Sequence, residues 1–146
     1  MPLPKESSYT TDYIFSLPEG QRAELIDGVV YDMALPNRLH QELVSELHYK
    51  ITDYIKKNNG ACKVFPAPFA VFLNADDKTY VEPDISVICD KSKLDDRGCV
   101  GAPDWIIEIA SPSTKRTDYG VKLFKYRSAG VREYWIVNPL TRTVKQ

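Results

Sequence analysis

Two acidic residues stand in or beside apolar segments that are typical of buried strands. Glu108 lies among isoleucines in the segment WIIEIA, and Asp84 follows Pro83 at the start of EPDISVI. Burying an ionised carboxylate costs several kcal/mol unless a cation or hydrogen-bond donors meet it. Glu108 is therefore interpreted in one of two ways: as the partner of an Arg or Lys at the strand end, or as a metal ligand.

Asp84 alone is ordinary, because the Pro-Asp dipeptide is common in turns. The two carboxylates together are more informative. Mg²⁺ takes a few hard protein oxygens and completes its shell with water and substrate phosphate, so two carboxylates at the ends of neighbouring strands are the minimal arrangement for it. Asp84 and Glu108 therefore predict a site for Mg²⁺ or Mn²⁺.

The elements that must position these residues follow from local patterns. Asp27-Gly28 is a pair favoured in type I′ turns, so residues 22–26 and 29–33 are predicted to form a β-hairpin that begins the sheet. Asn37 is a good N-cap for a long helix to about Asn58, whose apolar residues recur every three or four positions.

The rest of the chain is predicted to contain several strands and a second long helix. Residues 90–102 are expected to be a loop, and the helix is expected from Lys115 to Ala129, ending at Gly130. This order is typical of an α/β (α+β) domain with a mixed central β-sheet flanked by helices. The predicted strands are 62–65, 69–73, 84–89, 105–109 and 132–137, and a short helix is predicted from Thr10 or Thr11 to Leu17.

The length of 146 residues is that of one domain, so residues 1–146 are expected to fold as a unit. Residues 141–146 look like one more strand that is cut short. We therefore expect a chain that is truncated at its C-terminal end, or a shorter relative of a longer protein.

Composition excludes a disordered chain, since 43% of residues are hydrophobic and 27% are charged. The net charge of -1 offers no support for a nucleic-acid or membrane partner. That total hides a division, however. Residues 1–114 carry 11 basic and 18 acidic side chains, a net -7, whereas residues 115–146 carry 8 and 2, a net +6.

The three cysteines are odd in number and lack CxxC spacing, and no signal peptide precedes them. We expect them to be small core residues rather than metal ligands, and we expect a reducing cytoplasm as the compartment. No apolar run approaches the roughly 18 to 20 residues of a membrane-spanning helix, so no membrane partner is expected. The cysteines are Cys62, Cys89 and Cys99.

Several ordered motifs together resemble the Uma-type restriction endonuclease family of the PD-(D/E)XK nuclease superfamily. They are RAELIDG, EPDISVI, WIIEIASPST, the helical residues Asp118, Lys122 and Tyr126, and GVREYWIVNP. The resemblance covers about residues 10–140. It implies a restriction-endonuclease-like core, an N-terminal hairpin, and a divalent metal held by carboxylates on adjacent central strands.

The resemblance implies roles for individual residues. Asp84 matches the Asp of the PD motif, Glu108 matches the acidic residue of (D/E)XK, and the main-chain carbonyl of Ile109 is expected beside the metal. The Lys of that motif is replaced by Ala110. In relatives without it, a lysine from the following helix reaches the same space, and Lys122 is the matching position. The alternative is a plain i,i+4 pair of Lys122 with Asp118 on an exposed helix.

Other positions are implied more loosely. Glu24 matches an early acidic residue that joins the metal site in many superfamily members, although it can also be the solvent side of a strand. His40, Asp118 and Tyr126 are expected near the site, and for His40 a surface or capping role is the alternative. Phosphate contacts are expected from Lys115, Arg116 and Lys125, with Arg127 and Arg132 also available.

The function implied is metal-dependent hydrolysis of nucleic-acid phosphodiesters, with DNA as the expected substrate. Two rivals stay open. One is a catalytically inactive module of the same fold that binds nucleic acid or a protein partner, which the missing Lys at position 110 favours. The other is a structural homodimer that associates through the last strand and the segment Tyr134-Trp135.

Overall fold

The fold was analysed in a computed structural model that describes residues 9–112 and 114–146, except for the side chain of Lys115. In chain order the elements are α1 (Thr11–Phe15), β1 (Ala23–Ile26), β2 (Val29–Asp32), α2 (Arg38–Lys57), β3 (Lys63–Pro66), β4 (Val71–Phe72), β5 (Ile85–Ile88), η1 (Lys91–Lys93), β6 (Leu94–Asp95), β7 (Gly98–Val100), β8 (Trp105–Ile109), α3 (Lys115–Tyr119), α4 (Val121–Ala129), β9 (Glu133–Asn138) and β10 (Thr143–Lys145).

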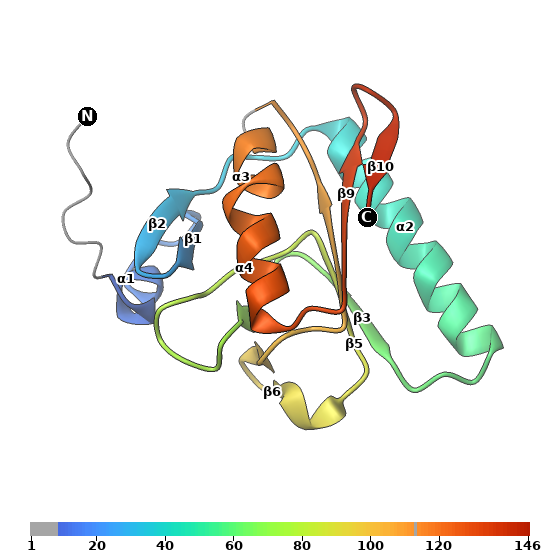
Figure 1. Cartoon of the computed structure of the whole chain (residues 1–146), viewed down its shortest axis with the longest axis horizontal. Helices are drawn as coiled ribbons and strands as arrows, with labels where there is room; N and C mark the ends of the chain where they lie inside the picture. Colours follow the sequence, from blue (N-terminus) through green and yellow to red (C-terminus); the bar gives the residue numbers. More distant parts are fainter. Residues whose placement is uncertain (1–8, 113) are drawn as a thin grey trace.

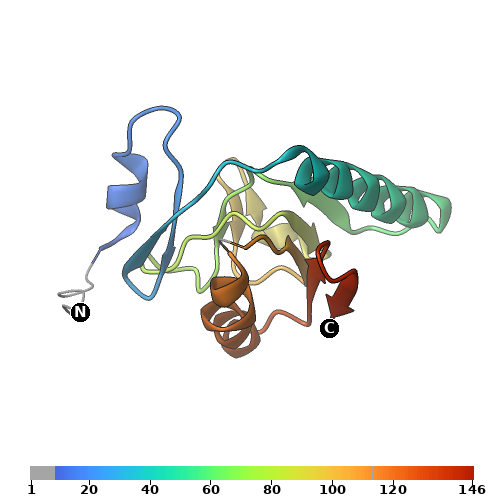
Figure 2. The same cartoon turned by 90° about the horizontal axis from the view of Figure 1, so that it is seen from above.

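The central sheet has the strand order β10-β9-β8-β5-β3 among the described residues. Strands β8 and β9 are parallel, joined by the crossover through α3 and α4, whereas the other neighbouring pairs are antiparallel. The sheet is therefore mixed, as predicted. Helix α2 covers one face of the sheet and α4 covers the other: Figure 1 shows the central strands nearly edge-on between these helices, and Figure 2 shows the same arrangement from above.

Alternation along β8 explains how both faces of the sheet become apolar. Ile107 and Ile109 belong to the cluster that packs under α2, and Ile106 belongs to the cluster that includes Tyr126 of α4. Successive side chains of a strand point to opposite faces, so Glu108 must lie on the α4 side together with Ile106. The strand therefore buries one carboxylate beneath α4.

The N-terminal hairpin is confirmed, and its turn has the positive φ of a type I′ turn, 49° at Asp27 and 81° at Gly28. The prediction that it begins the central sheet is wrong, because β1 and β2 form a separate two-stranded sheet. Leu25 instead pairs through an isolated bridge with Tyr80, with both N···O distances at 2.7 Å. The hairpin consequently packs beside the strand that leads into Asp84.

Two further expectations are corrected. Residues 90–102 are not a plain loop, because they contain η1, β6 and β7, and β7 pairs in parallel with β4. The helix predicted from Lys115 to Ala129 is divided at Gly120 into α3 and α4. Gly120 has φ -111° and ψ -95°, outside the helical region, so the axis is interrupted just before Lys122.

The cysteine prediction is wrong for two of the three residues. Cys62 and Cys89 form a disulfide, and Cys89 is exposed, whereas Cys99 is free and buried. Lys63 pairs with Ile88 in the antiparallel register of β3 and β5, so the next residues outward, Cys62 and Cys89, lie directly opposite each other. No helix in the described residues is long and apolar enough to cross a membrane.

Candidate active site

Asp84 and Glu108 are brought opposite each other by the register of β5 and β8. Ile85 pairs with Ile107 in this antiparallel ladder, so one step further outward Asp84 faces Glu108. The main-chain N–H of Asp84 donates to Glu108 Oε1 at 3.2 Å. The pairing of the two carboxylates therefore follows from the sheet itself and not from a flexible loop.

The carboxylate of Asp84 is held from two sides. The N–H of Ile109 donates to its Oδ2 at 2.7 Å, and Nε2 of His40 lies 3.1 Å from the same oxygen. His40 is in the first turn of α2, where the side chain of Asn37 caps the helix by accepting from the N–H of His40 at 2.8 Å. The hydrogen bond to Asp84 raises the pKa of His40, and partial burial opposes that rise.

Lys122 projects from α4 into the space beside Glu108. Its Nζ lies 2.8 Å from Glu108 Oε2 and 2.7 Å from Glu24 Oε1, and Asp118 Oδ1 is 3.9 Å away. Tyr126, one turn later on α4, donates its hydroxyl to the same Glu108 Oε2 at 2.9 Å. The spacing of 118, 122 and 126 thus places three polar groups on the inner face of α3 and α4.

The cluster around Lys122 is almost dry. The residue exposure is 5% for Glu24, 4% for Glu108, 2% for Asp118 and 5% for Lys122. Glu24 reaches this position because β1 is buried along its length, and its second oxygen accepts from the N–H of Glu82 at 2.8 Å. The interpretation of Glu24 as a solvent-facing strand residue is therefore wrong.

Burial sets the ionisation of the cluster. It raises the pKa of Glu108 well above its ordinary value, although the Lys122 ammonium opposes the rise. It likewise raises the pKa of Asp118 to about 6. Burial alone would lower the pKa of Lys122, but the carboxylates of Glu108, Glu24 and Asp118 outweigh it and raise the pKa well above normal. Lys122 is therefore a permanent cation at neutral pH.

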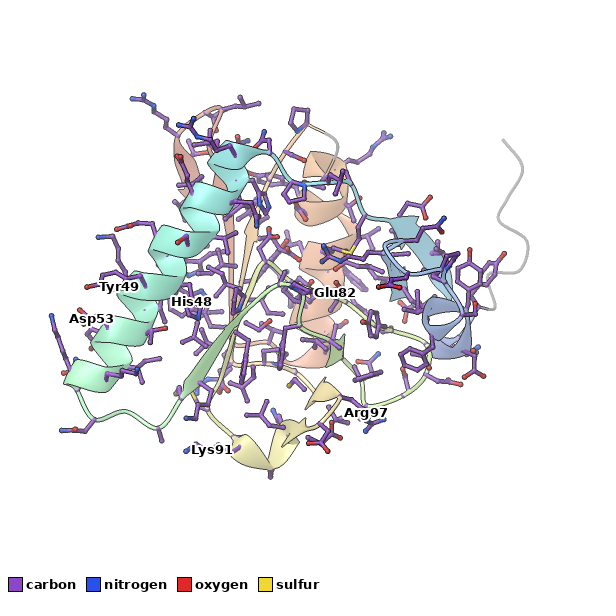
Figure 3. The ribbon with its side chains drawn as sticks, turned by 180° about the vertical axis from the view of Figure 1, so that it is seen from behind. His48, Tyr49, Asp53, Glu82, Lys91 and Arg97 are labelled. Carbon is purple, nitrogen blue, oxygen red and sulfur yellow. A yellow bond between two sulfur atoms is a disulfide. The ribbon has the colours of Figure 1, made fainter. Side chains whose placement is uncertain are left out.

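The sequence did not predict a second polar cluster, centred on Glu82, which lies beside the cluster around Lys122. Glu82 accepts from Arg22 Nε at 2.8 Å and from the Tyr80 hydroxyl at 2.9 Å, and it lies in the centre of the molecule in Figure 3. Tyr134 of β9 donates its hydroxyl to the carbonyl of Asp118 at 2.9 Å. The signal for Glu82 was available in the letters EPD, because a second acidic residue precedes Pro83 beside an apolar strand.

The expected phosphate contacts are not gathered at the site. Lys125 Nζ lies 2.6 Å from Asp27 Oδ1 and ties α4 to the hairpin turn, and Lys125 does not line the cleft. Arg116 is exposed on α3, and the side chain of Lys115 lies outside the described residues. Ala110, at the position of the motif lysine, is buried and lines the cleft.

All of the other predicted site residues except Tyr126 meet in one cleft of about 550 Å³. The groups with chemistry lie at its floor, and the walls come from the segment before α2, from residues 110–112 and the start of α3, and from the turn after β9. The lining includes Glu24, His40, Glu82, Asp84, Glu108, Ile109, Asp118 and Lys122. Tyr126 supports the floor from beneath through its bond to Glu108.

The donor chemistry fits a hard divalent cation held by two carboxylates. Among residues 9–112 and 114–146 no three His, Cys, Asp or Glu side chains form a group that could hold a metal ion. Mg²⁺ often uses only one or two carboxylates, with water and phosphate as the remaining ligands. Asp84 and Glu108 supply such a pair. Both oxygens of Glu108 already accept protein donors, from Asp84, Lys122 and Tyr126. Both oxygens of Glu24 likewise meet Lys122 and a main-chain N–H.

Known proteins resemble this chain in sequence and in fold. A crystal structure described as a putative nuclease belonging to DUF820, from Anabaena variabilis ATCC 29413, matches with a TM-score of 0.73 and 26% sequence identity, over 92% of this chain and 76% of that chain. No protein with a curated description matches. Residues 10–145 match the family Uma2, described as "Putative restriction endonuclease". The match spans nearly the whole chain, which therefore belongs to the Uma2 family.

Proposed function

We propose that this protein hydrolyses phosphodiester bonds in nucleic acid, DNA being the expected substrate, with a divalent metal at Asp84 and Glu108. The observation that supports the proposal is the convergence of an opposed carboxylate pair and a buried lysine at the floor of one cleft. A divalent ion bound there would neutralise charge on a non-bridging phosphate oxygen and acidify a bound water.

The protein's own groups divide the remaining work. An ammonium carries three donors, and Lys122 uses two of them on Glu24 and Glu108. The third is available to a phosphate oxygen, where a permanent positive charge stabilises the negative charge that builds up during displacement. Because its pKa is raised, Lys122 acts in this proposal as an electrostatic donor and not as the base. His40 and the N–H of Ile109 fix the orientation of Asp84.

The test is nicking of supercoiled DNA in Mg²⁺ or Mn²⁺ by the wild type, Asp84→Asn and Glu108→Gln. Each substitution keeps the side-chain shape but removes the charge that would hold the ion, so we expect nicking to fall by at least about 100-fold. Asp53→Asn is the matched control, because Asp53 projects outward from α2 in Figure 3 and pairs with Lys57. Equal nicking by all four proteins would reveal a contaminating nuclease and would sink the proposal.

The second candidate is a nuclease fold that binds nucleic acid without cleaving it. Ala110 in place of the motif lysine, and the closure of Lys122 onto both Glu24 and Glu108, favour it. Calorimetric titration separates the two functions. An Mg²⁺ or Mn²⁺ site that disappears in Asp84→Asn supports the enzyme. No site at millimolar metal, together with salt-dependent DNA binding, supports the binding module.

A further inference from the structure

The mouth of the cleft differs sharply in chemistry from its floor. Leu35 is 95% exposed, Leu39 is 47% exposed and Leu140 is 72% exposed, and all three line the same cleft whose carboxylates are buried. They come from three separate places: the segment before α2, the first turn of α2, and the turn after β9. Single exposed leucines are common, but a group around one cleft marks a surface that binds a ligand with apolar faces.

The size of the cleft limits what can reach the floor. A volume of about 550 Å³ lies within the range of small-molecule pockets and accommodates a few nucleotide units, not a double helix. A duplex is a stiff rod whose major groove alone is about 12 Å wide, and bringing one of its strands down to a buried floor costs unstacking and bending. A single strand bends and unstacks far more easily.

Exposed arginines lie next to two of these leucines in sequence and on α3, although these arginines do not line the cleft themselves. Arg38 adjoins Leu39 and its side chain is 90% exposed, Arg142 lies two residues after Leu140 and is exposed, and Arg116 is exposed on α3. The guanidinium group binds phosphate in a bidentate manner and stacks on bases. Arg38 meets Glu42 at 2.8 Å, but so exposed a pair is weak and competes poorly with phosphate.

One exposed carboxylate, Asp32 on the hairpin side, also lines the cleft. It disfavours a phosphate path along β2. The path that remains passes the start of α2, the start of α3 and the turn between β9 and β10, which lie together at one end of the molecule in Figure 1. Both the leucines and the arginines lie on this path.

We propose that the cleft accepts single-stranded nucleic acid, or an unpaired segment of a duplex, with unstacked bases against Leu35 and Leu140. The arginines contact the flanking phosphates, and one phosphate descends to the floor. The inference rests on the proposed function for the identity of the ligand. It adds that the substrate is an unpaired strand, and that the apolar side chains at the mouth bind base faces.

The test measures binding separately from cleavage. Glu108→Gln protein, in which cleavage is expected to be lost, is titrated by fluorescence anisotropy with a labelled single strand that contains 2-aminopurine and with the duplex of the same sequence. We expect the single strand to bind at least about 10-fold more tightly, with a change in 2-aminopurine fluorescence as bases move onto the leucines. Equal or tighter binding of the duplex would overturn the inference.

The variant Leu35→Ser/Leu140→Ser should lose about 10-fold or more in single-strand affinity, because base faces packed on these leucines would lose their apolar contact. Phe124→Ser is the matched control, since Phe124 is 74% exposed on α4 and does not line the cleft. Thermal melting and the single variant Leu35→Ala guard against a folding defect. Unchanged strand affinity in the double variant and in Leu35→Ala would contradict the role of the leucines.

Three other outcomes are informative. If sedimentation shows that the double variant converts a dimer to a monomer without weakening strand binding, the mouth is an interface between copies and the inference is wrong. Tight single-strand binding without any cleavage in metal would leave the inference standing while the proposed function fails. Efficient cleavage of intact duplex without preference for the single strand would support the proposed function and overturn the inference.

Discussion

Lys122 is the residue on which both the stability and the chemistry of the cleft depend. Its Nζ lies within 2.8 Å of Glu24 and Glu108 in a cluster that is nearly closed to solvent. Removing one partner from a buried ion cluster leaves uncompensated charge, which costs far more than the pair contributes. The residue is therefore both a candidate for the catalytic electrostatic donor and a structural counterion.

The change Lys122→Met tests the structural part of this description. At pH 8 we expect the free energy of unfolding to fall by about 3 to 5 kcal/mol, because three buried carboxylates lose their cation. At pH 5 the loss should be smaller. The pKa of Asp118 is raised to about 6 by burial and that of Glu108 is raised well above normal, so these carboxyls are stable when protonated and become destabilising as pH rises through those values.

Urea unfolding at the two pH values measures this difference. Lys50→Met is the matched control, because Lys50 forms an exposed pair with Glu46 at 3.4 Å, and such pairs contribute at most about 1 kcal/mol. A loss below about 1 kcal/mol at pH 8, or a loss that does not depend on pH, would show that the cluster is less dry or less charged than the distances indicate.

At the scale of elements, the chain's local signals predicted the helices and most strands. Asn37 caps α2 as expected, and Asp27-Gly28 makes the hairpin turn. Local patterns could not give the register that places Asp84 opposite Glu108. They also could not show that Leu25 of the hairpin pairs with Tyr80 instead of with a strand of the central sheet. Both depend on contacts between residues that are distant in sequence, which no short window contains.

The site was predictable to a similar degree. The carboxylate pair could be inferred because acidic residues stand out within apolar strands, and Lys122 came from the family resemblance together with its spacing from Asp118 and Tyr126. Glu82 and Arg22 were missed, because each has an ordinary turn or surface interpretation until the hairpin is placed beside β5. The break at Gly120 was also missed, since glycine inside a helical pattern does not by itself specify an interruption.

The interruption at Gly120 should matter for the position of Lys122. A Cβ at residue 120 would lie 2.9 Å from the carbonyl oxygen of Arg116, so the backbone must shift in Gly120→Ala. We expect a stability loss of about 1 to 3 kcal/mol, as for other overpacked sites, and slower nicking because Lys122 is displaced from Glu108. Urea unfolding and the nicking rate of the folded protein are the two measurements.

Gly130→Ala provides the comparison for this prediction. Gly130 ends α4 with φ 96° and a Cβ there meets no atom within 4 Å, so the cost should be a backbone cost of about 1 kcal/mol with normal nicking. If Gly120→Ala nicks DNA as fast as Gly130→Ala, the position of Lys122 does not depend on the break between α3 and α4.

At the scale of the whole molecule, the acidic and the basic segments of the chain are not separated in space. The acidic excess of residues 1–114 includes the buried carboxylates of the cleft floor, and the basic excess of residues 115–146 includes Lys122, which lies among them. Other basic residues of that segment are exposed, such as Arg116 on α3 and Arg142 in the turn between β9 and β10. The near-zero total is therefore compatible with a nucleic-acid ligand.

The disulfide between Cys62 and Cys89 fastens the sheet at the end remote from this cleft. Strand β5 begins beside Asp84 and ends beside Cys89, five residues later, which is about 17 Å along a strand. Closing a loop of this length, with a sequence separation of 27, is expected to stabilise the fold by about 3 kcal/mol in the chain-entropy description. The disulfide should therefore affect stability without affecting the chemistry at the floor of the cleft.

The double change Cys62→Ser/Cys89→Ser tests this separation of roles. It should lower the free energy of unfolding by about 3 kcal/mol, and the folded variant should nick DNA at the wild-type rate. Dithiothreitol should lower the melting temperature of the wild type but not that of the variant. Burial raises the pKa of Cys99 to about 11, so this thiol should react slowly in either protein and contribute nothing to the difference. Two rapidly reacting thiols in the untreated wild type, with a melting temperature equal to that of the variant, would mean that the cysteines are unpaired in solution and that packing alone holds β3 against β5.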